Sequence, residues 1–516
     1  MSSLYNTRRD FLKAMGLGAA SLAVAGCANA SEPVGSGASK ARPNILFCLA
    51  DDWSWPHASI AGDKVVKTPT FDRVARQGVL FENAFVSSPS CTPSRGAILT
   101  GQWHWRLEEG GNLWSTLQTK FDVYPDLLEE AGYHVGYTRK GWAPGSVEVG
   151  GRTRNPAGPQ YKSFEEFMKA RPESKPFCFW FGSQDPHRAY KWQSGINSGI
   201  KLEDVEVPPC FPDSEEVRTD ICDYYWEVQR FDTEVGELLK MLEDSGQLDN
   251  TLVVISGDNG LPFPRCKSNL YDTGTNVPLA VRWPAAVKSG RVVEDFISLT
   301  DLAPTFLEAA GLKPPAEMTA RSFLDILTSG KSGSVDPKRD HVLTGKERHV
   351  PGQENDIGGY PMRAIRTHDF LYIHNFKPDR WPSGYPAGYS QPVDIVVSKP
   401  RDTKFGYADT DASPTKSYML RHRDDLKVKR LFEMAFAKRP AEELFDLQKD
   451  PGQLNNVAGE PQYANVKKEL AAALMAELKA TKDPRVLGRG DAFDQYPYYG
   501  GGVPDKSPAA PRRTKR

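Results

Sequence analysis

The chain has 516 residues, which is enough for one large domain or two unequal ones. Its formal net charge is −1 and 25% of its residues are charged. This balance excludes a nucleic-acid-binding protein that acts through a general basic field. The partners of the protein must therefore be recognised at a localised site.

The N-terminus has the features of an export signal. Arg8 and Arg9 precede an apolar run from Ala14 to Ala25, and small residues follow this run. The combination is typical of a twin-arginine signal and not of a structural helix. We assign residues 1–27 to this signal, which makes the twin-arginine translocase a partner and the periplasm the expected location.

Two processing outcomes are compatible with the end of the signal. Val24-Ala25-Gly26-Cys27 resembles a lipobox with Cys27 as the acylated residue, whereas Ala28-Asn29-Ala30 resembles a site of soluble release. Of these two outcomes we favour the lipoprotein, tethered to the outer membrane at Cys27. No later apolar stretch approaches the ~20 residues of a membrane span, so we expect the membrane to be reached only through this lipid anchor. Residues 28–42, rich in Ser, Gly, Ala and Pro, read as a linker.

Almost continuous apolar runs predict buried strands at 44–50, 177–181 and 251–256. Polar residues begin where each run stops, as they do at the carboxyl ends of an open, mostly parallel sheet. A helical pattern from Ile221 to Leu242 lies between two of these strands and is closed by Gly246. The alternation predicts an α/β domain with helices on both faces, which we place at residues 43–350.

The pattern shortens after residue 350 and predicts a smaller C-terminal subdomain with an antiparallel sheet at 351–490. We assign 491–516 to a tail, because the residues after Gly500 are rich in Pro, Lys and Arg. The expected elements of the subdomain are strands at 362–367, 370–375 and 443–447 and a helix at 466–479.

Two of the predicted strand ends carry oxygen-bearing side chains. Asp51 and Asp52 follow the first strand, and Asp258 and Asn259 follow another. Carboxylates brought together at one sheet edge need a cation. Oxygen ligands favour a hard ion over zinc, and we expect Ca²⁺ in preference to Mg²⁺.

Cys91 differs from the other cysteines in its surroundings. Pro93 and Ser94 suit the first turn of a helix, which places Cys91 at a helix N-terminus that attracts anions, with Arg95 one turn further on. On these residues alone, Cys91 could be a thiolate nucleophile of low pKa. A thiolate beside a hard cation is poor chemistry, however, which indicates that the thiol is not the working form.

The remaining cysteines have neither the density nor the spacing of a disulfide scaffold. Cys48 lies within an apolar run and is expected in the core. One pair, Cys210 with Cys222, could form a bridge in an oxidising compartment.

Cys91-Thr92-Pro93-Ser94-Arg95 resembles the Cys-x-Pro-x-Arg signature of the type I sulfatases, in which the cysteine is oxidised to formylglycine. The resemblance runs from about residue 43 to about residue 480. It implies an alkaline-phosphatase-like α/β fold and a formylglycine-generating or radical maturase as a partner. Within the family, the branch of the heparan N-sulfatases (sulfamidases) is the most similar. The motifs that carry this likeness are Asp185-Pro186-His187-Arg188, Asp258 to Pro264, and Tyr360-Pro361-Met362-Arg363.

The resemblance also implies roles for individual residues. Calcium would be held by Asp51, Asp52, Asp258, Asn259 and the formylglycine at position 91. Sulfate oxygens would be bound by Arg95, Lys140, His187 and Lys267, with His187 as the general acid. Many sulfatases have a histidine two places after the lysine, and here Trp142 stands there. The base that serves the nucleophile is therefore open, and we expect neither His104 nor His134 to replace it.

Five residues are candidates for contact with a sulfated saccharide substrate. They are Arg188, Glu347, Arg348, His349 and Arg363. The sugar, the sulfate position and the choice between sulfate ester and sulfamate stay open.

Two other functions also stay open. One is a phosphate or phosphonate monoester hydrolase of the same fold, and the other is a non-catalytic glycan-binding lipoprotein in which Cys91 is never converted.

Overall fold

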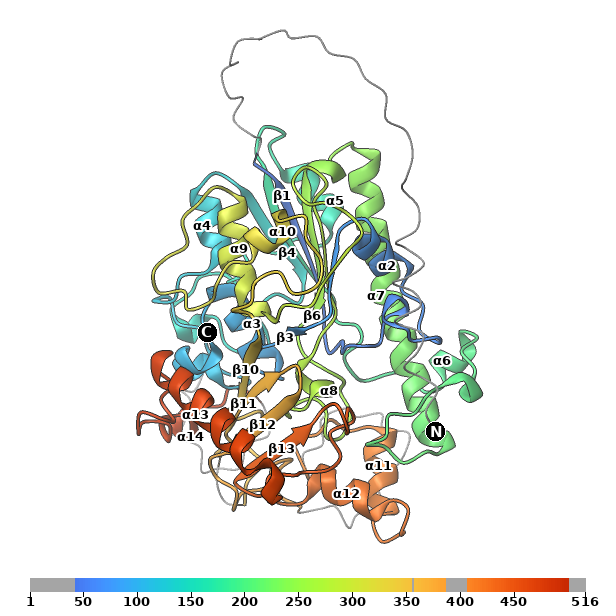
Figure 1. Cartoon of the computed structure of the whole chain (residues 1–516). Coiled ribbons are helices and arrows are strands. Elements are labelled where there is room, and N and C mark those ends of the chain that lie inside the picture. The colour runs from blue at the N-terminus through green and yellow to red at the C-terminus, as the bar shows by residue number, and fades with distance from the viewer. Residues whose placement is uncertain (1–41, 355–356, 387–405, 501–516) are drawn as a thin grey trace, which may run out of the picture. The chain divides into compact units, whose positions relative to one another are not determined.

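A mixed sheet with strand order β4-β5-β1-β6-β7-β2-β8 occupies the centre of the computed structural model, which describes residues 42–354, 357–386 and 406–500 (Figure 1). Its strands β4, β5, β1 and β6 are parallel, and β7 is antiparallel to both of its neighbours. The strands are β1 (Asn44–Ala50), β2 (Val79–Phe81), β4 (His134–Arg139), β5 (Phe177–Gly182), β6 (Thr251–Gly257), β7 (Leu279–Arg282) and β8 (Arg291–Val293). The predicted α/β class with a mostly parallel sheet is confirmed.

The side chains of β1 alternate between two hydrophobic clusters, one on each face of the sheet. Ile45, Phe47 and Leu49 belong to one cluster, and Leu46 and Cys48 belong to the other. A strand covered on both faces needs apolar side chains at every position, which explains the unbroken apolar run in the sequence. Figure 1 shows the covering helices on the two sides. They are α3 (Cys91–Thr100), α4 (Tyr124–Glu130) and α9 (Leu302–Ala309) on one face, and α2 (Pro69–Arg76), α5 (Phe164–Ala170) and α7 (Glu215–Asp244) on the other.

A second sheet with antiparallel order β10-β11-β12-β13 is formed by the C-terminal part of the chain. The expected strands and helix of this region are confirmed. However, β10 pairs with β11, so the sheet begins ahead of the boundary that we expected near residue 350. The elements are β10 (His341–Lys346), β11 (Met362–Thr367), β12 (Phe370–Asn375), β13 (Glu442–Asp446), α11 (Pro414–Arg421), α12 (Lys429–Phe436), α13 (Ala464–Ala480) and α14 (Ala492–Gln495).

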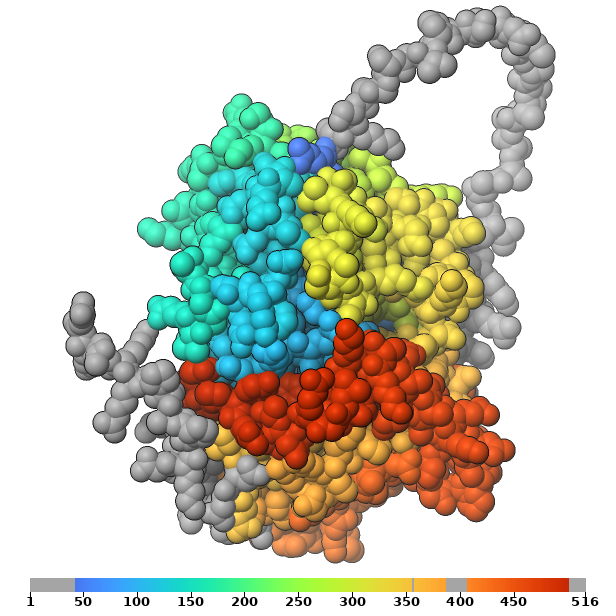
Figure 2. Space-filling model, turned by 90° about the vertical axis from the view of Figure 1, so that its left-hand side faces the viewer, coloured from blue at the N-terminus to red at the C-terminus, as the bar shows by residue number. Residues whose placement is uncertain are grey.

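The start of the expected tail is packed against the body of the protein, which corrects its assignment from residue 491. Phe493 in α14 is buried, and its carbonyl accepts a hydrogen bond of 2.9 Å from the side chain of Asn112. Figure 2 shows the red surface of the last described residues lying against the cyan surface of the early ones. The rest of the tail, 501–516, lies outside the described residues, as do the signal and almost all of the linker.

The expected bridge between Cys210 and Cys222 is not formed, because both residues have free thiols. The thiol of Cys210 lies beside that of Cys266 instead. Cys48 is buried in the core, as predicted. Within the described ranges, no helix is long and apolar enough to cross a membrane.

The burial of α7 against the sheet leads to a prediction. Phe231 is fully buried on this helix, and its ring packs against Trp53 at 5.6 Å and Phe181 at 6.3 Å. We expect Phe231→Ala to lower the free energy of unfolding by about 3–5 kcal/mol, measured in urea, because the change leaves a cavity in the core. Met241→Ala on the same helix, at a side chain that is 36% exposed, serves as the control and should cost less than about 1 kcal/mol. Equal losses in the two variants would contradict this packing.

Candidate active site

The strand order β4-β5-β1-β6 brings four carboxyl ends to one edge of the sheet. The residues that follow them are Lys140 after β4, His187 after β5, Asp51 and Asp52 after β1, and Asp258 and Asn259 after β6. Backbone hydrogen bonds continue between these ends, from the Asp51 amide to the Asp185 carbonyl and from the Asp258 amide to the Ala50 carbonyl, both at 3.0 Å. The fold thus gathers residues that are more than 200 positions apart, as seen for Asp52 and Asp258.

Three carboxylates and one thiol form the centre of this edge. Ligand atoms of Asp51, Asp52, Cys91 and Asp258 all lie within 4.8 Å of one another, and all four residues are buried. Asp52 adopts a φ of 73°, a left-handed conformation that is uncommon for a residue with a side chain, although aspartate tolerates it better than most.

Asn259 completes the centre. Its amide nitrogen donates to Oδ1 of Asp52 at 2.9 Å, and its buried Oδ1 accepts no hydrogen bond from any described residue. A buried amide oxygen without a donor is costly, and a cation would satisfy it.

Two lysines offset part of the negative charge. Nζ of Lys140 lies 2.5 Å from Oδ2 of Asp51, and Nζ of Lys267 lies 2.7 Å from Oδ2 of Asp52. Burial raises the pKa of Asp51, but Lys140, His187 and other cations outweigh it and hold this pKa below its usual value. Burial dominates at Asp52 and raises its pKa, with repulsion from the two neighbouring carboxylates adding to the effect. The two adjacent acids therefore differ in their affinity for protons.

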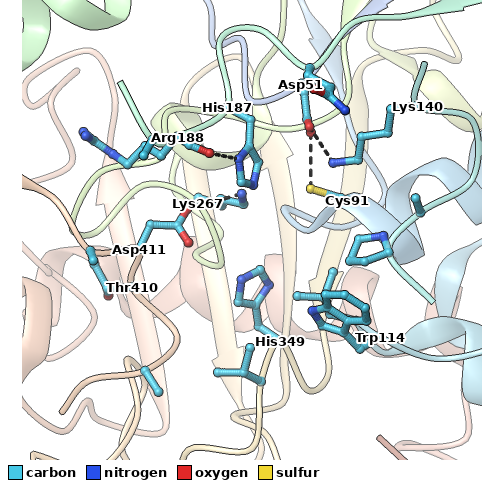
Figure 3. A pocket seen from close by; sticks show the side chains of 18 of the residues that line it. Asp51, Cys91, Trp114, Lys140, His187, Arg188, Lys267, His349, Thr410 and Asp411 are labelled. Atoms are coloured by element: carbon cyan, nitrogen blue, oxygen red, sulfur yellow. Dashed lines mark hydrogen bonds and ion pairs between the residues drawn. The ribbon is translucent and has the colours of Figure 1, made fainter. Parts of the chain in front are cut away.

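Cys91 occupies the first position of α3, as the sequence predicts. Its Sγ lies 3.4 Å from Oδ1 of Asp51 (Figure 3). Burial raises the pKa of the thiol well above its usual value, and this outweighs the two nearby lysines. The free thiol is therefore a poor nucleophile here, and the alternative of a thiolate with a low pKa is not supported.

Arg95 is fully buried and supports the site from behind. Its Nε donates to Oδ2 of Asp258 at 2.6 Å, and its Nη1 donates to the carbonyls of Lys140 and Gly141 at 2.7 and 2.9 Å. These contacts join α3, β6 and the segment that carries Lys140. The guanidinium orients the carboxylate of Asp258 and is not among the groups that line the pocket, in contrast to the expected contact with sulfate.

A pocket of about 640 Å³ opens in front of these groups, and Cys91, Lys140, His187 and Lys267 line it. Figure 3 shows Lys140 and Cys91 both directed at Asp51, with His187 and Lys267 on the neighbouring wall. Nδ1 of His187 lies 2.5 Å from the carbonyl oxygen of Arg188. A carbonyl oxygen only accepts, so Nδ1 carries the hydrogen of this bond. The other ring nitrogen, Nε2, stays available for a contact with substrate. Nε2 lies 3.9 Å from Oδ2 of Asp52.

The expected substrate contact by the side chain of Arg188 is corrected by its internal partners. Two hydrogen bonds of 2.7 and 2.9 Å join its guanidinium to Asp220, and a third of 2.8 Å reaches the Pro262 carbonyl. The guanidinium also lies between the rings of Tyr190 and Phe263, at 4.5 and 4.4 Å. Arg188 borders the pocket, but its positive charge is paired with Asp220.

Glu347, Arg348 and Arg363 are buried and lie outside the pocket lining, which corrects the expectation that they contact substrate. Arg363 forms ion pairs of 2.6 Å with both Glu347 and Asp483. Arg348 donates to the carbonyls at positions 496 and 497 at 2.8 and 2.9 Å, which fixes the segment that precedes Tyr498. Motif position alone does not reveal whether a guanidinium faces a cavity or a carboxylate.

His349, for which we expected a contact with substrate, lines the pocket. Its Nδ1 lies 2.8 Å from Oγ of Ser90, and burial lowers the pKa of the imidazole to about 4, which keeps it neutral at neutral pH. The pocket also contains Trp114, Asp411 and Tyr498, which were not predicted. The sequence offers weak signals for two of these residues. Asp411 lies in the run Asp409-Thr410-Asp411 before a helix start, and Tyr498 lies in an aromatic cluster.

Trp142 is buried beneath α3, where Gly96 leaves room for its indole. Its backbone makes two hydrogen bonds of 3.0 and 2.9 Å with the side chain of Asn155. Among the described residues that line the pocket, neither His104 nor His134 is found.

A family model described as Sulfatase matches residues 43–147 and 159–312. The chain belongs to the sulfatase family. A second model, described as N-sulphoglucosamine sulphohydrolase, C-terminal, matches residues 266–381 and confirms the predicted likeness to the sulfamidases. By family, this sulfatase is a sulfuric ester hydrolase.

Curated relatives match most of the chain. It is 27% identical to an ulvan-active sulfatase of Formosa agariphila, over 88% of this chain and 78% of the relative. It is 28% identical to the N-sulphoglucosamine sulphohydrolase of Homo sapiens, over 87% of this chain and 93% of the relative. The sulfatase likeness thus extends across both sheets.

Solved structures confirm the expected alkaline-phosphatase-like sulfatase fold. A protein solved in complex with its substrate D-glucosamine-2-N,6-O-disulfate aligns with a TM-score of 0.60 at 20% identity, over 86% of this chain and 98% of that one. The phosphonate monoester hydrolase of Agrobacterium radiobacter aligns with a TM-score of 0.59 at 17% identity, over 86% and 97%. The same fold therefore occurs in proteins named for different esters.

The internal pairing of Arg188 leads to a second prediction. Arg188→Met leaves the buried carboxylate of Asp220 without its partner, and we expect it to lower the free energy of unfolding by about 3 kcal/mol in urea. The double variant Arg188→Met with Asp220→Asn should recover part of this loss. Normal stability together with a raised KM for a sulfated sugar would instead indicate a contact with substrate.

Proposed function

We propose that this sulfatase hydrolyses the sulfate ester or sulfamate of a sulfated saccharide, with a formylglycine made from Cys91 and a bound calcium ion. The observation that carries the proposal is the placement of Cys91 within 4.8 Å of three carboxylates at the N-terminus of α3, in front of a pocket lined by Lys140, His187 and Lys267. The matched family models and the saccharides named for the relatives support the substrate class.

The donor set fits a hard cation. Asp51, Asp52 and Asp258 supply carboxylate oxygens, and Asn259 supplies a buried amide oxygen that has no other partner among the described residues. An ion of the calcium type takes oxygen ligands of this kind and would relieve the repulsion between the three carboxylates. Bound there, it would act as a Lewis acid on a sulfate oxygen.

The chain's own residues then have separate tasks. Lys140 and Lys267 carry positive charge into the pocket and would bind the free sulfate oxygens. Nε2 of His187 would hold the proton that the leaving sugar oxygen or nitrogen requires. Oxidation of Cys91 and hydration of the resulting aldehyde would supply a hydroxyl as the nucleophile toward sulfur.

The proposed cellular location is based on the N-terminal sequence. The twin-arginine pattern supports export to the periplasm, and the lipobox supports a tether at Cys27. A maturase of the formylglycine-generating or radical type is the partner that conversion of Cys91 requires.

Conversion of Cys91 is tested directly. We expect mass spectrometry of the Cys91 peptide from the native host to show formylglycine, and Cys91→Ala to abolish sulfate release because the nucleophile is lost.

Lys140→Ala should lower kcat/KM at least about 100-fold, since one charge that stabilises the developing negative charge is removed. Ser245→Ala, at the end of α7, is the control and should keep full activity. An unmodified thiol throughout, or full activity in Cys91→Ala, would refute the mechanism.

A second function has one supporting observation, the structural likeness to a phosphonate monoester hydrolase. Rates on an aryl sulfate, an aryl phosphate and an aryl phosphonate that share one leaving group separate the two. We expect the sulfate to be preferred, because the matched family model and the curated relatives are those of sulfatases. A clear preference for the phosphonate would replace the sulfatase proposal. A parallel screen of desalted sulfated oligosaccharides, scored by released sulfate, identifies the sugar.

A further inference from the structure

A carboxylate faces the anion-binding pocket from the side opposite Trp114. Asp411 lies in the segment before α11, and Figure 3 shows its side chain turned toward Lys267, with Trp114 on the other side of the pocket. Its Oδ2 lies 3.3 Å from Nζ of Lys267. Nevertheless, this oxygen accepts no hydrogen bond from any described residue. A negative group weakens the attraction of an anion-binding pocket for sulfate. We therefore expect Asp411 to have a role other than binding sulfate.

The carboxylate is ionised and held in place. Burial would raise its pKa, but nearby cations, Lys267 first, outweigh burial and hold it well below its usual range. An ionised carboxylate accepts hydrogen bonds and cannot donate them. Its natural ligand in a sugar pocket is therefore a hydroxyl group.

Three buried contacts fix the segment around Asp411. Nζ of Lys416 donates to the carbonyls of residues 406, 407 and 410 at 3.0, 3.0 and 2.8 Å. Asp409 forms an ion pair of 2.6 Å with Lys346. Oγ1 of Thr415 donates to Asp220 at 2.7 Å, and Asp220 is the partner of Arg188. A carboxylate fixed in this way can discriminate between ligands by position.

The contacts of Lys267 relate the position of Asp411 to the reaction centre. Lys267 bridges Asp52 and Asp411 with contacts of 2.7 and 3.3 Å, so a single ammonium group separates Asp411 from the carboxylates around Cys91. A sulfate bound at Lys140 and Lys267 would place the carbon that bears it at the level of this ammonium group. A hydroxyl on a ring carbon bonded to the sulfated one would then lie within reach of Asp411; for a sugar sulfated at the nitrogen on carbon 2, the free hydroxyl in such a position is that on carbon 3.

We propose that Asp411 accepts a hydrogen bond from the hydroxyl on the carbon next to the sulfated position, so that the protein selects sugars with a free neighbouring hydroxyl and rejects those sulfated at both positions. The inference rests on the proposed function, because it assigns a substrate preference to the same pocket. The attractive element is the acceptor oxygen, and the repulsive one is the negative charge.

Three matched sugars test this assignment, namely glucosamine N-sulfate, its 3-deoxy analogue and its 3-O-sulfated analogue. We expect the wild type to favour the first over each of the others by at least about tenfold in kcat/KM, the size of a hydrogen bond to a charged group. Asp411→Ala should bring both ratios near one. Asp411→Asn keeps an acceptor oxygen but loses the negative charge. Its kcat/KM for the 3-O-sulfated sugar should therefore be about tenfold higher than that of the wild type, and part of the preference for the hydroxyl should remain.

The control is Asp185→Asn, which neutralises another carboxylate of the pocket that lies 3.3 Å from Arg230. Both ratios should stay at their wild-type values in this variant, whatever its absolute rate. If Asp411→Ala lowers kcat/KM by the same factor on all three sugars, Asp411 acts only through Lys267 and the proposal is overturned.

Binding separates this inference from the proposed function. The three sugars are titrated calorimetrically into the Cys91→Ala protein, with and without Asp411→Asn. If the wild type releases no sulfate but binding still depends on the 3-substituent through Asp411, the proposed reaction fails and the recognition stands. If sulfate is released but neither binding nor turnover depends on the 3-substituent, only the recognition is overturned.

Discussion

The repulsion between three buried carboxylates is the constraint on which the rest of the molecule depends. Asp51, Asp52 and Asp258 follow adjacent parallel strands, and their oxygens share a space of 4.8 Å with Sγ of Cys91. Two unit charges 4 Å apart repel by about 4 kcal/mol at an effective dielectric constant of 20. Lys140, Lys267 and Arg95 oppose this repulsion from three separate segments. The sheet alone cannot form the site, because it brings the charges together without neutralising them.

The strands and the longer helices could be predicted because their signals are local. β1 and β6 are continuous apolar runs that end in aspartates, and α3 begins where Pro93 and Ser94 suit a first turn. Once the strand order is known, the carboxylates must meet, so the reactive centre follows from the same signals. The boundary near residue 350 was less predictable, because β10 pairs with a strand that comes later in the chain.

The recognition residues were predicted poorly for a physical reason. Arg188 and Arg363 lie in family-like motifs, yet both are buried against carboxylates, Asp220 in one case and Glu347 with Asp483 in the other. An arginine in a sequence shows its charge but not its partner, and the partner here lies far away in the chain. Asp411 and Tyr498 were missed for the converse reason. Each enters the pocket from a loop whose path is set by long-range contacts, such as those of Lys416 and Arg348.

The pocket is therefore built from two kinds of structure with different tasks. Cys91, Lys140 and His187 stand at the ends of regular elements joined by backbone hydrogen bonds, which keeps the reacting groups at fixed separations. Asp411 and Tyr498 stand on C-terminal loops held by single buried ion pairs and carbonyl contacts. A change in such a loop would alter the lining of the pocket without moving the carboxylates around Cys91. Asp52 and Asp411 both pair with the ammonium group of Lys267. This shared contact connects the carboxylates around Cys91 with the loop that carries Asp411.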